Sequence, residues 1–214
     1  MEYADILIIG AGAAGISAAK AAALTGKSVV LADRGEAMGG VLLQCTHRGF
    51  GKQLTGPEYV RQLTADFPET VRFLPKTTVL SVSREKIVRL SGGRTLRFDR
   101  LILASGCREI PAGALNIAGT RPRGVYTAGQ MQEMMNLHDY IPEGPAVILG
   151  SGDIGLIMAS HLTDAGVAVA AIVEKKDAIG AMMRNQKFLQ KVQIPFYFCD
   201  TVQILHGHPR LESR

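Results

Sequence analysis

Short apolar runs that end at a glycine or an acidic residue recur along the chain and predict buried strands. Two of these runs flank a helical segment near the N-terminus, and two flank a second such segment about 140 residues later. The strands are expected at residues 6–9, 28–32, 146–149 and 167–173, and the helices at residues 13–25 and 154–165. Continuous apolar runs of this length are typical of parallel strands buried on both faces. The pattern therefore predicts two related β-α-β units in series, not a solenoid.

The part of the chain between the two units predicts a loop, a helix and an antiparallel meander. Residues 35–56 are glycine-rich and suggest a functional loop, and Gly56 begins a helix that reaches about Ala65, with Pro57 in its first turn. The meander strands are expected at residues 71–74, 77–82, 86–90 and 94–98. Gly92 and Gly93 supply a turn before the last of them. Residues 101–104 then predict a further buried strand.

The second half of the chain begins with a proline-rich stretch that is interpreted as a connector holding a short helix near residues 128–137. After the second unit we expect a helix over 178–191, a strand over 195–199, and the first arm of a hairpin over 202–205 that turns near Gly207. The second arm would begin where the sequence stops, so we expect this unit to be incomplete.

These elements predict an α/β fold with two Rossmann-like units of three-layer β-β-α character. The first unit carries the antiparallel meander, and the second is expected to be truncated at its C-terminus. The expected domains are a first nucleotide-binding domain over residues 1–115, a connector over 116–144 and a second nucleotide-binding domain over 145–214.

The first strand leads into Gly10-Ala-Gly12-Ala-Ala-Gly15, a pattern typical of a dinucleotide-binding turn. The first glycine permits the tight turn, the second lets a diphosphate approach the backbone, and the third lets the helix pack on the strand. The free N–H groups of the helix start then favour the phosphates. Asp33 lies 18 residues after Gly15, at the end of the next strand, where a carboxylate accepts hydrogen bonds from a ribose.

The same pattern recurs as Gly150-Ser-Gly152-Asp-Ile-Gly155, and Glu174 lies 19 residues after Gly155. A glutamate at this position binds a free 2′-hydroxyl and repels a 2′-phosphate, so we expect NAD in preference to NADP. Lys175 and Lys176 follow it, and either a phosphate contact or a solvated loop fits them; the loop is the preferred interpretation.

Composition and charge narrow the class of protein. The chain has 214 residues, of which 47% are hydrophobic and 20% charged, so it can bury a sizeable core. Its net charge of +5 comes from scattered Lys and Arg without a long basic run, and we expect no nucleic-acid partner. Neither a secretory leader nor an apolar run of the about 18–20 residues that span a bilayer is present. We therefore expect a cytoplasmic protein without a membrane span.

The three cysteines, Cys45, Cys107 and Cys199, are widely spaced and form no CxxC pair. This spacing favours neither a disulfide framework nor a metal site. Cys107 and Cys199 are interpreted as packing residues.

Two glycine motifs separated by a meander resemble the flavoproteins with two dinucleotide-binding domains, the pyridine nucleotide–disulfide oxidoreductases and the relatives of thioredoxin reductase. The resemblance covers the whole chain and implies FAD in the first unit and NAD(P) in the second. Leu103-Ala-Ser-Gly106 resembles a characteristic segment of that superfamily that lies against the flavin nucleotide. The implied FAD-binding residues are Gly10, Gly12, Ala13, Ala14, Gly15, Asp33, Arg34, Gly40, Val41, Val79, Ala104, Ser105 and Gly106. The implied NAD-binding residues are Gly150, Ser151, Gly152, Asp153, Ile154, Gly155 and Glu174.

A narrower resemblance implies a partner for the chain. Five segments are similar to FAD/NAD-dependent oxidoreductases associated with bacterial glycerol-3-phosphate dehydrogenase. They are Met38–Gly51, Leu54–Tyr59, Gly106–Glu109, Gly113–Ile117 and Leu149–Ala159. That likeness implies electron transfer between NAD and a partner flavoprotein dehydrogenase, and a small acceptor stays open as an alternative to that partner. The oligomeric state stays open between a homo-oligomer and a hetero-oligomer.

The chain also departs from the superfamily pattern, and alternatives follow. Cys45 stands alone after Gly39-Gly40, so the usual dithiol is absent, and Asp153 and Ile157 replace an aromatic residue and a glutamate of many relatives. Cys45 is therefore either a single redox thiol of a peroxidase- or oxidase-like enzyme, or a loop cysteine packed beneath the flavin. A truncated, non-catalytic nucleotide-binding fragment or subunit is a further alternative to the FAD- and NAD-dependent oxidoreductase.

Overall fold

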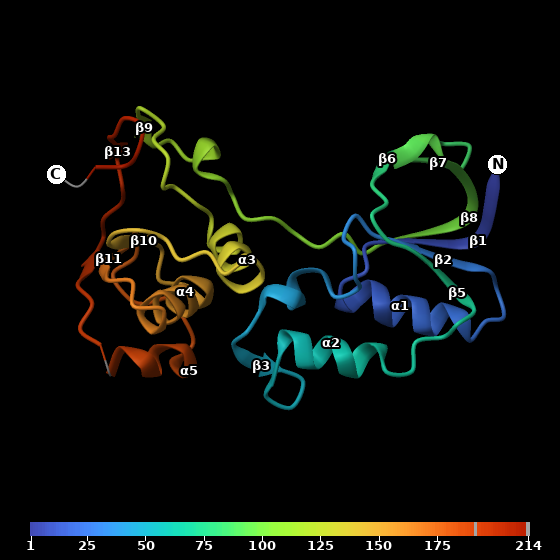
Figure 1. The fold of residues 1–214 in the computed structure, drawn as a ribbon, viewed down its shortest axis with the longest axis horizontal. Helices are drawn as coiled ribbons and strands as arrows, with labels where there is room; N and C mark the ends of the chain where they lie inside the picture. The colour runs from blue at the N-terminus through green and yellow to red at the C-terminus, as the bar shows by residue number, and fades with distance from the viewer. Residues whose placement is uncertain (191, 213–214) are drawn as a thin grey trace. The chain divides into compact units, whose positions relative to one another are not determined.

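The computed structural model describes residues 1–190 and 192–212 and shows two compact units, residues 1–107 and 108–214 (Figure 1). Each unit contains parallel strands joined through a glycine turn and a helix. Residues 116–144, the expected connector, contain a strand and a helix of the second unit. The predicted α/β fold with a repeated β-α-β arrangement is confirmed.

The first unit is built on a six-stranded mixed sheet with strand order β5-β2-β1-β8-β7-β6. Its strands are β1 (Glu2–Ile9), β2 (Val29–Ala32), β5 (Val71–Leu74), β6 (Val79–Val82), β7 (Ile87–Leu90) and β8 (Thr95–Leu103). The first half of this sheet is parallel, and Ile8 pairs with Leu31 on one side and with Ile102 on the other. This register brings the carboxyl ends of β1, β2 and β8 to one edge, where the glycine turn begins.

One helix covers a face of the parallel strands, and a second helix packs against the first. Helix α1 (Ala13–Ala23) presents Ile16, Ala19 and Ala22 as buried residues, and its alanines allow close packing on β1 and β2. Helix α2 (Gly56–Thr64) begins with a capping box, in which the Thr55 side chain accepts from the Glu58 N–H and Glu58 accepts from the Thr55 N–H. The turn before α2 contains the 3₁₀ helix η1 (Gly40–Gln44) and the strands β3 (Arg48–Phe50) and β4 (Leu54–Thr55).

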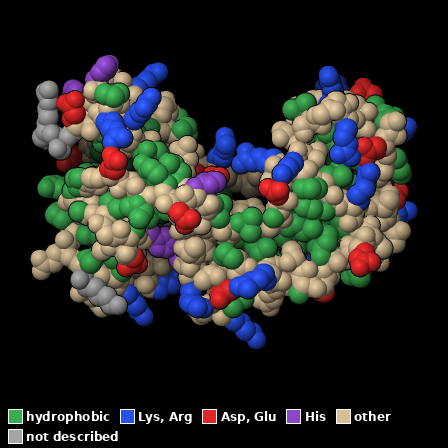
Figure 2. Space-filling view, viewed as in Figure 1, with side chains coloured by type: hydrophobic (Ala, Val, Ile, Leu, Met, Phe, Trp, Pro, Cys, Tyr) green, Lys and Arg blue, Asp and Glu red, His purple; other side chains and the backbone are tan. Residues whose placement is uncertain are grey.

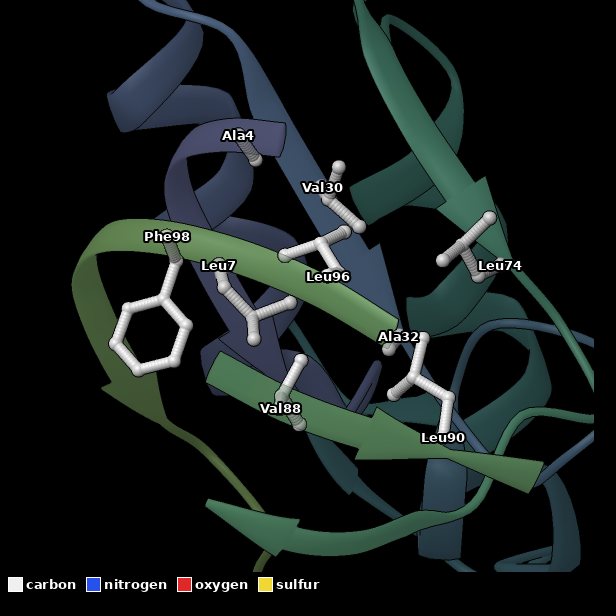
Figure 3. Packing of buried hydrophobic residues seen from close by; sticks show 9 residues of the cluster. All are labelled: Ala4, Leu7, Val30, Ala32, Leu74, Val88, Leu90, Leu96 and Phe98. Carbon is white, nitrogen blue, oxygen red and sulfur yellow. The ribbon is translucent and has the colours of Figure 1, made fainter. Parts of the chain in front are cut away.

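The antiparallel meander β6-β7-β8 covers the opposite face. Nine buried residues join the two layers in one core (Figure 3). They are Ala4, Leu7, Val30, Ala32 and Leu74 from the parallel strands and Val88, Leu90, Leu96 and Phe98 from the meander. Leu7 is 0% exposed, although it lies on the face away from α1. The first unit therefore has the three layers that the pattern predicted, with the short 3₁₀ turn η2 (Ser91–Gly93) before β8.

Two expectations for the first unit are wrong. Residues 71–74 do not belong to the meander, because β5 pairs in parallel with β2 after the crossover through α2. The runs at 94–98 and 101–104 are not two strands, because β8 is continuous over both. Its first half pairs antiparallel with β7, and much of its length pairs in parallel with β1. Polar residues within the strand, such as Asp99 and Arg100, face solvent and do not interrupt it.

The second unit is built on a three-stranded parallel sheet of β10 (Ala146–Leu149), β11 (Val169–Glu174) and β12 (Phe196–Phe198). Helices α3 (Ala128–His138) and α4 (Asp153–Asp164) pack on one face, where Met131, Met158 and Leu162 are buried. Helix α3 begins with its own capping box, formed by Thr127 and Gln130. The unit also contains η3 (Ala112–Ala114), β9 (Ala118–Gly119), α5 (Met183–Gln186), η4 (Lys187–Gln190) and β13 (Ile204–Leu205).

The second sheet is not buried on both faces, contrary to the expectation for residues 146–149. Val147 is 56% exposed and Leu149 is 41% exposed. Ile148, which points to the opposite face, packs against the helices. Among the described residues of this unit, no meander covers the face that holds Val147, so only one face of the apolar strand is buried.

The segments after β11 also differ from expectation. The helix expected over 178–191 is described as the short α5 followed by η4, and residue 191 lies outside the described residues. The hairpin arm expected at 202–205 is β13, which pairs in parallel with β9. The chain does reverse near Gly207, where an isolated antiparallel bridge joins Gly207 to Leu211.

Candidate functional site

The first glycine turn connects β1 to α1 with a backbone that needs glycine at defined positions. Gly10 has φ of +103°, and a Cβ there would collide with the carbonyl oxygen of Ala104 at the end of β8. A Cβ on Gly15 would collide with the carbonyl oxygen of Gly10. At Gly12 a Cβ would meet nothing within 4 Å, so the backbone of the second glycine faces open space. This is the arrangement that lets a diphosphate approach the helix start.

Asp33 closes β2 and binds the turn through its carboxylate. Oδ2 accepts from the Ala11 N–H at 2.6 Å, and Oδ1 accepts from the Gly35 N–H at 2.7 Å. The strand pairing that places β2 beside β1 thus holds the acid directly beside the first glycines. A carboxylate held in this position can accept hydrogen bonds from a ribose whose diphosphate lies at the turn.

Loops that follow β2 and β8 complete the surroundings of the first turn. The Gly39 N–H donates to the Ala11 carbonyl at 2.7 Å, and a Cβ on Gly40 would lie 3.2 Å from the Gly12 Cα atom. Ala104, by its contact with Gly10, brings the exposed Ser105 and Gly106 to the same edge of the sheet.

The structure places the other predicted FAD-binding residues less directly. Ala13 and Ala14 form the first turn of α1, Arg34 is exposed directly after Asp33, and Val41 is 65% exposed in η1. Val79 begins β6 and packs against the core between the two layers. Contacts of these residues with a cofactor stay predictions.

The second glycine turn repeats the backbone geometry of the first. Gly150 also has φ of +103°, and a Cβ on Gly155 would collide with the Gly150 carbonyl oxygen. The Gly150 N–H donates to the Val173 carbonyl at 2.7 Å, as the Gly10 N–H donates to Ala32 at 2.8 Å. A Cβ on Gly152 would meet nothing within 4 Å. The sequence repeat is therefore a repeat of three-dimensional structure.

Glu174 takes the place of Asp33 in the second unit and accepts three hydrogen bonds. Oε2 accepts from the Ser151 N–H at 2.7 Å and from the Ser151 hydroxyl at 2.6 Å, and Oε1 accepts from the Lys176 N–H at 3.0 Å. The hydrogen bond from the Ser151 side chain, followed by the two backbone donors, lowers the pKa of Glu174 to about 2. The carboxylate is therefore ionised at neutral pH.

Asp153 lies in the first turn of α4 and holds the loop after β11. Its Oδ1 accepts from the Met182 N–H at 2.9 Å and from the Asn185 side-chain nitrogen at 2.6 Å. The hydrogen bond from the Met182 backbone and that from Asn185 lower the pKa of Asp153. Asp153 thus contacts the residue directly before the helix that begins at Met183. Ile154, beside it, is half exposed.

Sequence reasoning missed Gly180 and Asn185, which belong to the surroundings of the second turn. Gly180 lies beside Gly152, with a Cβ position 3.9 Å from the Gly152 Cα atom, as Gly40 lies beside Gly12. The sequence carries a signal for Gly180, because it follows Glu174 by six residues, much as Gly40 follows Asp33 by seven.

Cys45 is buried at the end of η1, where it is 7% exposed. Its thiol donates to the Val41 carbonyl at 3.2 Å, and burial raises the pKa of the thiol. A buried, protonated thiol favours the interpretation of a packed loop cysteine, and a redox role of Cys45 stays a prediction. Cys107 and Cys199 are exposed, so the expectation that they are packing residues is wrong.

The part of the chain that the structure describes has neither the ligand cluster of a metal site nor the long apolar helix of a membrane span. It contains no cluster of three or more His, Cys, Asp or Glu side chains arranged to hold a metal ion. Within the same residues, the helices are too short or too polar to cross a bilayer. On the face drawn in Figure 2, Lys and Arg side chains are scattered among acidic ones.

The fold and the two turns together define a protein with two Rossmann-like α/β units, each with a glycine turn between its first strand and helix. The model of the pyridine nucleotide-disulphide oxidoreductase family matches residues 4–210, and the chain belongs to that family.

Individual relatives support this assignment. An opine oxidase subunit of Rhizobium meliloti is 31% identical over 189 residues, which are 81% of this chain and 35% of the relative. The alpha subunit of sarcosine oxidase from Rhizobium meliloti (strain 1021) is 30% identical over 203 residues, 86% of this chain and 20% of the relative. The chain thus spans about a third or less of these two proteins. The crystal structure of thioredoxin reductase from T. acidophilum superposes with a TM-score of 0.73 at 18% identity, covering 99% of this chain and 69% of that one, and so shares the fold.

Proposed function

We propose that the chain is the nucleotide-binding part of a cytoplasmic FAD-dependent NAD(P)H oxidoreductase. In this proposal FAD binds the first glycine turn with its ribose on Asp33, and NAD binds the second with its ribose on Glu174. The observation that carries it is the repeated turn, in which the second glycine faces open space and a strand-end carboxylate lies beside it. Family membership over residues 4–210 supports the same assignment.

The side chains and backbone of the chain would bind and orient the two cofactors. The N–H groups at the starts of α1 and α4 would donate to the diphosphates, and the positive end of each helix dipole would favour their charge. Asp33 and Glu174 would accept from ribose hydroxyls and so fix the position of each adenosine half. The bound cofactors supply the redox chemistry, which is hydride transfer between the nicotinamide and the flavin.

The preference for NAD over NADP rests on the charge of Glu174. Three hydrogen bonds hold its carboxylate ionised beside the turn, so a 2′-phosphate at that position would meet a fixed negative charge. Lys175 and Lys176 are exposed and follow Glu174 directly, and we propose that their side chains remain in solvent. We therefore propose that NADH binds more tightly than NADPH.

The partner of the chain is proposed to be a flavoprotein dehydrogenase that exchanges electrons with the bound FAD. Two relatives are named as subunits, one of an opine oxidase and one of a sarcosine oxidase, which supports a partner protein in a larger assembly. The sequence resemblance to oxidoreductases associated with glycerol-3-phosphate dehydrogenase suggests a dehydrogenase of that kind.

The test is the visible spectrum of the purified chain after incubation with FAD and removal of free flavin. We expect flavin absorbance that NADH bleaches, with NADPH less effective. A colourless protein that still binds NADH would contradict FAD binding and would favour the alternative of a non-catalytic nucleotide-binding subunit.

Matched variants separate the two sites. Asp33→Asn should weaken FAD binding about tenfold or more and leave NADH binding unchanged, because hydrogen bonds to charged groups contribute about 1.5–3 kcal/mol. Glu174→Gln should weaken NADH binding by a similar factor, reduce discrimination against NADPH and leave FAD binding unchanged. Equal effects of both variants on both ligands, measured by calorimetry, would contradict the assignment.

A further inference from the structure

The side chain of Ser151 is buried between the strand-end acid and the loop that follows it. Ser151 is 0% exposed, so its hydroxyl does not reach the surface at which a nucleotide would bind. The hydroxyl donates to Glu174 Oε2 at 2.6 Å and accepts from the Gly180 N–H at 3.1 Å. One hydroxyl thus joins the acid at the end of β11 to the loop that lies beside Gly152.

The first unit lacks this connection. Ala11 stands at the position of Ser151, and its backbone makes the corresponding contacts: the N–H donates to Asp33 and the carbonyl accepts from the Gly39 N–H. In the second unit a side-chain hydroxyl accepts from the loop N–H. Glu174 is also one methylene longer than Asp33, so more of its side-chain rotamers must be excluded before the carboxylate is fixed in one place.

The hydrogen bonds of Ser151 determine which part of the Glu174 carboxylate is open to a ligand. A carboxylate oxygen accepts about two hydrogen bonds. Oε2 already accepts from the Ser151 N–H and the Ser151 hydroxyl, whereas Oε1 accepts from the Lys176 N–H alone among the described contacts. The remaining capacity for a ribose hydroxyl therefore lies on Oε1, and the carboxylate is held in one orientation.

We propose that Ser151 is a positioning residue that sets the preference of the second unit for NAD by fixing Glu174 and the loop around Gly180. This inference rests on the proposed binding of NAD at the second turn. Without the hydroxyl, Glu174 keeps its backbone donors but can rotate away from the 2′ position, and the Gly180 N–H loses its acceptor. The same change removes a donor that favours the ionised carboxylate.

The test titrates the full chain and its Ser151→Ala variant with NADH and with NADPH by calorimetry. We expect the affinity for NADH to fall by up to about tenfold, because a freed Glu174 side chain must be ordered when the ribose binds, and the NADH-to-NADPH preference to shrink. Ser151→Thr, which keeps the hydroxyl, should retain most of the preference. Ser160→Ala is the matched control, because its hydroxyl lies 3.5 Å from Asp164 on the exposed side of α4 and should change neither quantity.

A second readout follows the carboxyl carbon of Glu174 by NMR. The pKa of Glu174 should be about 2 in the wild-type chain and should rise in Ser151→Ala. A purely structural role of Ser151 would lower the melting temperature without changing the nucleotide preference.

The outcomes separate this inference from the proposed function. A wild-type chain that binds no NADH would refute the proposed function and the inference with it. A wild-type chain that binds NADH, together with a folded Ser151→Ala variant of unchanged NADH-to-NADPH preference, would overturn the role of Ser151 alone, whatever the pKa of Glu174 in that variant. Should Ser151→Ala fail to fold, the wild-type titration decides, since an ordinary pKa near 4.5 for Glu174 contradicts its fixation by Ser151.

Discussion

The two glycine turns share one backbone geometry but sit in differently built units. In both, the first glycine has φ of +103° and the third lies against the carbonyl of the first. The strand that leads into the first turn is buried on both faces, whereas the strand that leads into the second exposes Val147 and Leu149. The backbone geometry of the turn therefore depends on its own strand, helix and strand-end acid, and not on the layer that covers the far face of the sheet.

The two units should differ most in the free energy of unfolding that is lost when equivalent strand residues are replaced by alanine. Leu7→Ala should destabilise the first unit by about 2–5 kcal/mol, because it leaves a cavity between the sheet and the meander. Val147→Ala, at the corresponding position of β10, should cost less than about 1 kcal/mol, because the side chain is already in solvent. Urea unfolding followed through amide signals of each unit measures both values. Equal losses would show that the face holding Val147 is covered in the protein.

A smaller difference in lost stability is expected when the first glycine of each turn is replaced by alanine. Gly150→Ala should cost about 1–3 kcal/mol from the left-handed backbone alone, because no atom lies within 4 Å of the added Cβ. Gly10→Ala carries the same strain, and its Cβ also collides with the Ala104 carbonyl, so overpacking should add about 1–3 kcal/mol. Thermal unfolding of the two variants tests this order. A Gly150→Ala variant less stable than Gly10→Ala would contradict it.

The smallest effect concerns the pH dependence of the second unit. The pKa of Glu174 is lowered from 4.5 to about 2, so the folded unit binds this proton less readily than the unfolded chain does. The contribution of Glu174 to stability is therefore present above about pH 4.5 and is lost as the pH falls toward 2. Glu174→Gln should remove this part of the acid sensitivity. Identical acid unfolding curves for the variant and the wild-type chain would count against the hydrogen bonds to Ser151.

Much of the site could be predicted from the sequence because its requirements are local. Gly10, Gly15 and Asp33 lie within one β-α-β unit, where strand length and helix start fix their spacing, and the second unit repeats that spacing. The direction of β5 could not be predicted from its residues, because Val71–Leu74 is compatible with a strand in either direction and only the crossover through α2 makes it parallel.

Contacts between distant segments account for most of the remaining errors. The first residues of the helix expected at 178–191 form a loop instead, and residues distant in the sequence bind it: Asp153 accepts from the Met182 N–H and the Ser151 hydroxyl accepts from the Gly180 N–H. The exposure of Val147 depends on what packs over the sheet, which an apolar run does not encode. The bond from the Ser151 hydroxyl to Glu174 joins residues 23 positions apart and carries no periodic signal.

In the proposed function, each glycine turn binds the diphosphate of a different redox nucleotide. Backbone amide NMR of the full chain, titrated first with FAD and then with NADH, tests it most directly. FAD should shift the amides of residues 10–15 and leave residues 150–155 unchanged, and NADH should then shift residues 150–155. Both ligands perturbing the same turn, or neither turn responding, would contradict the account.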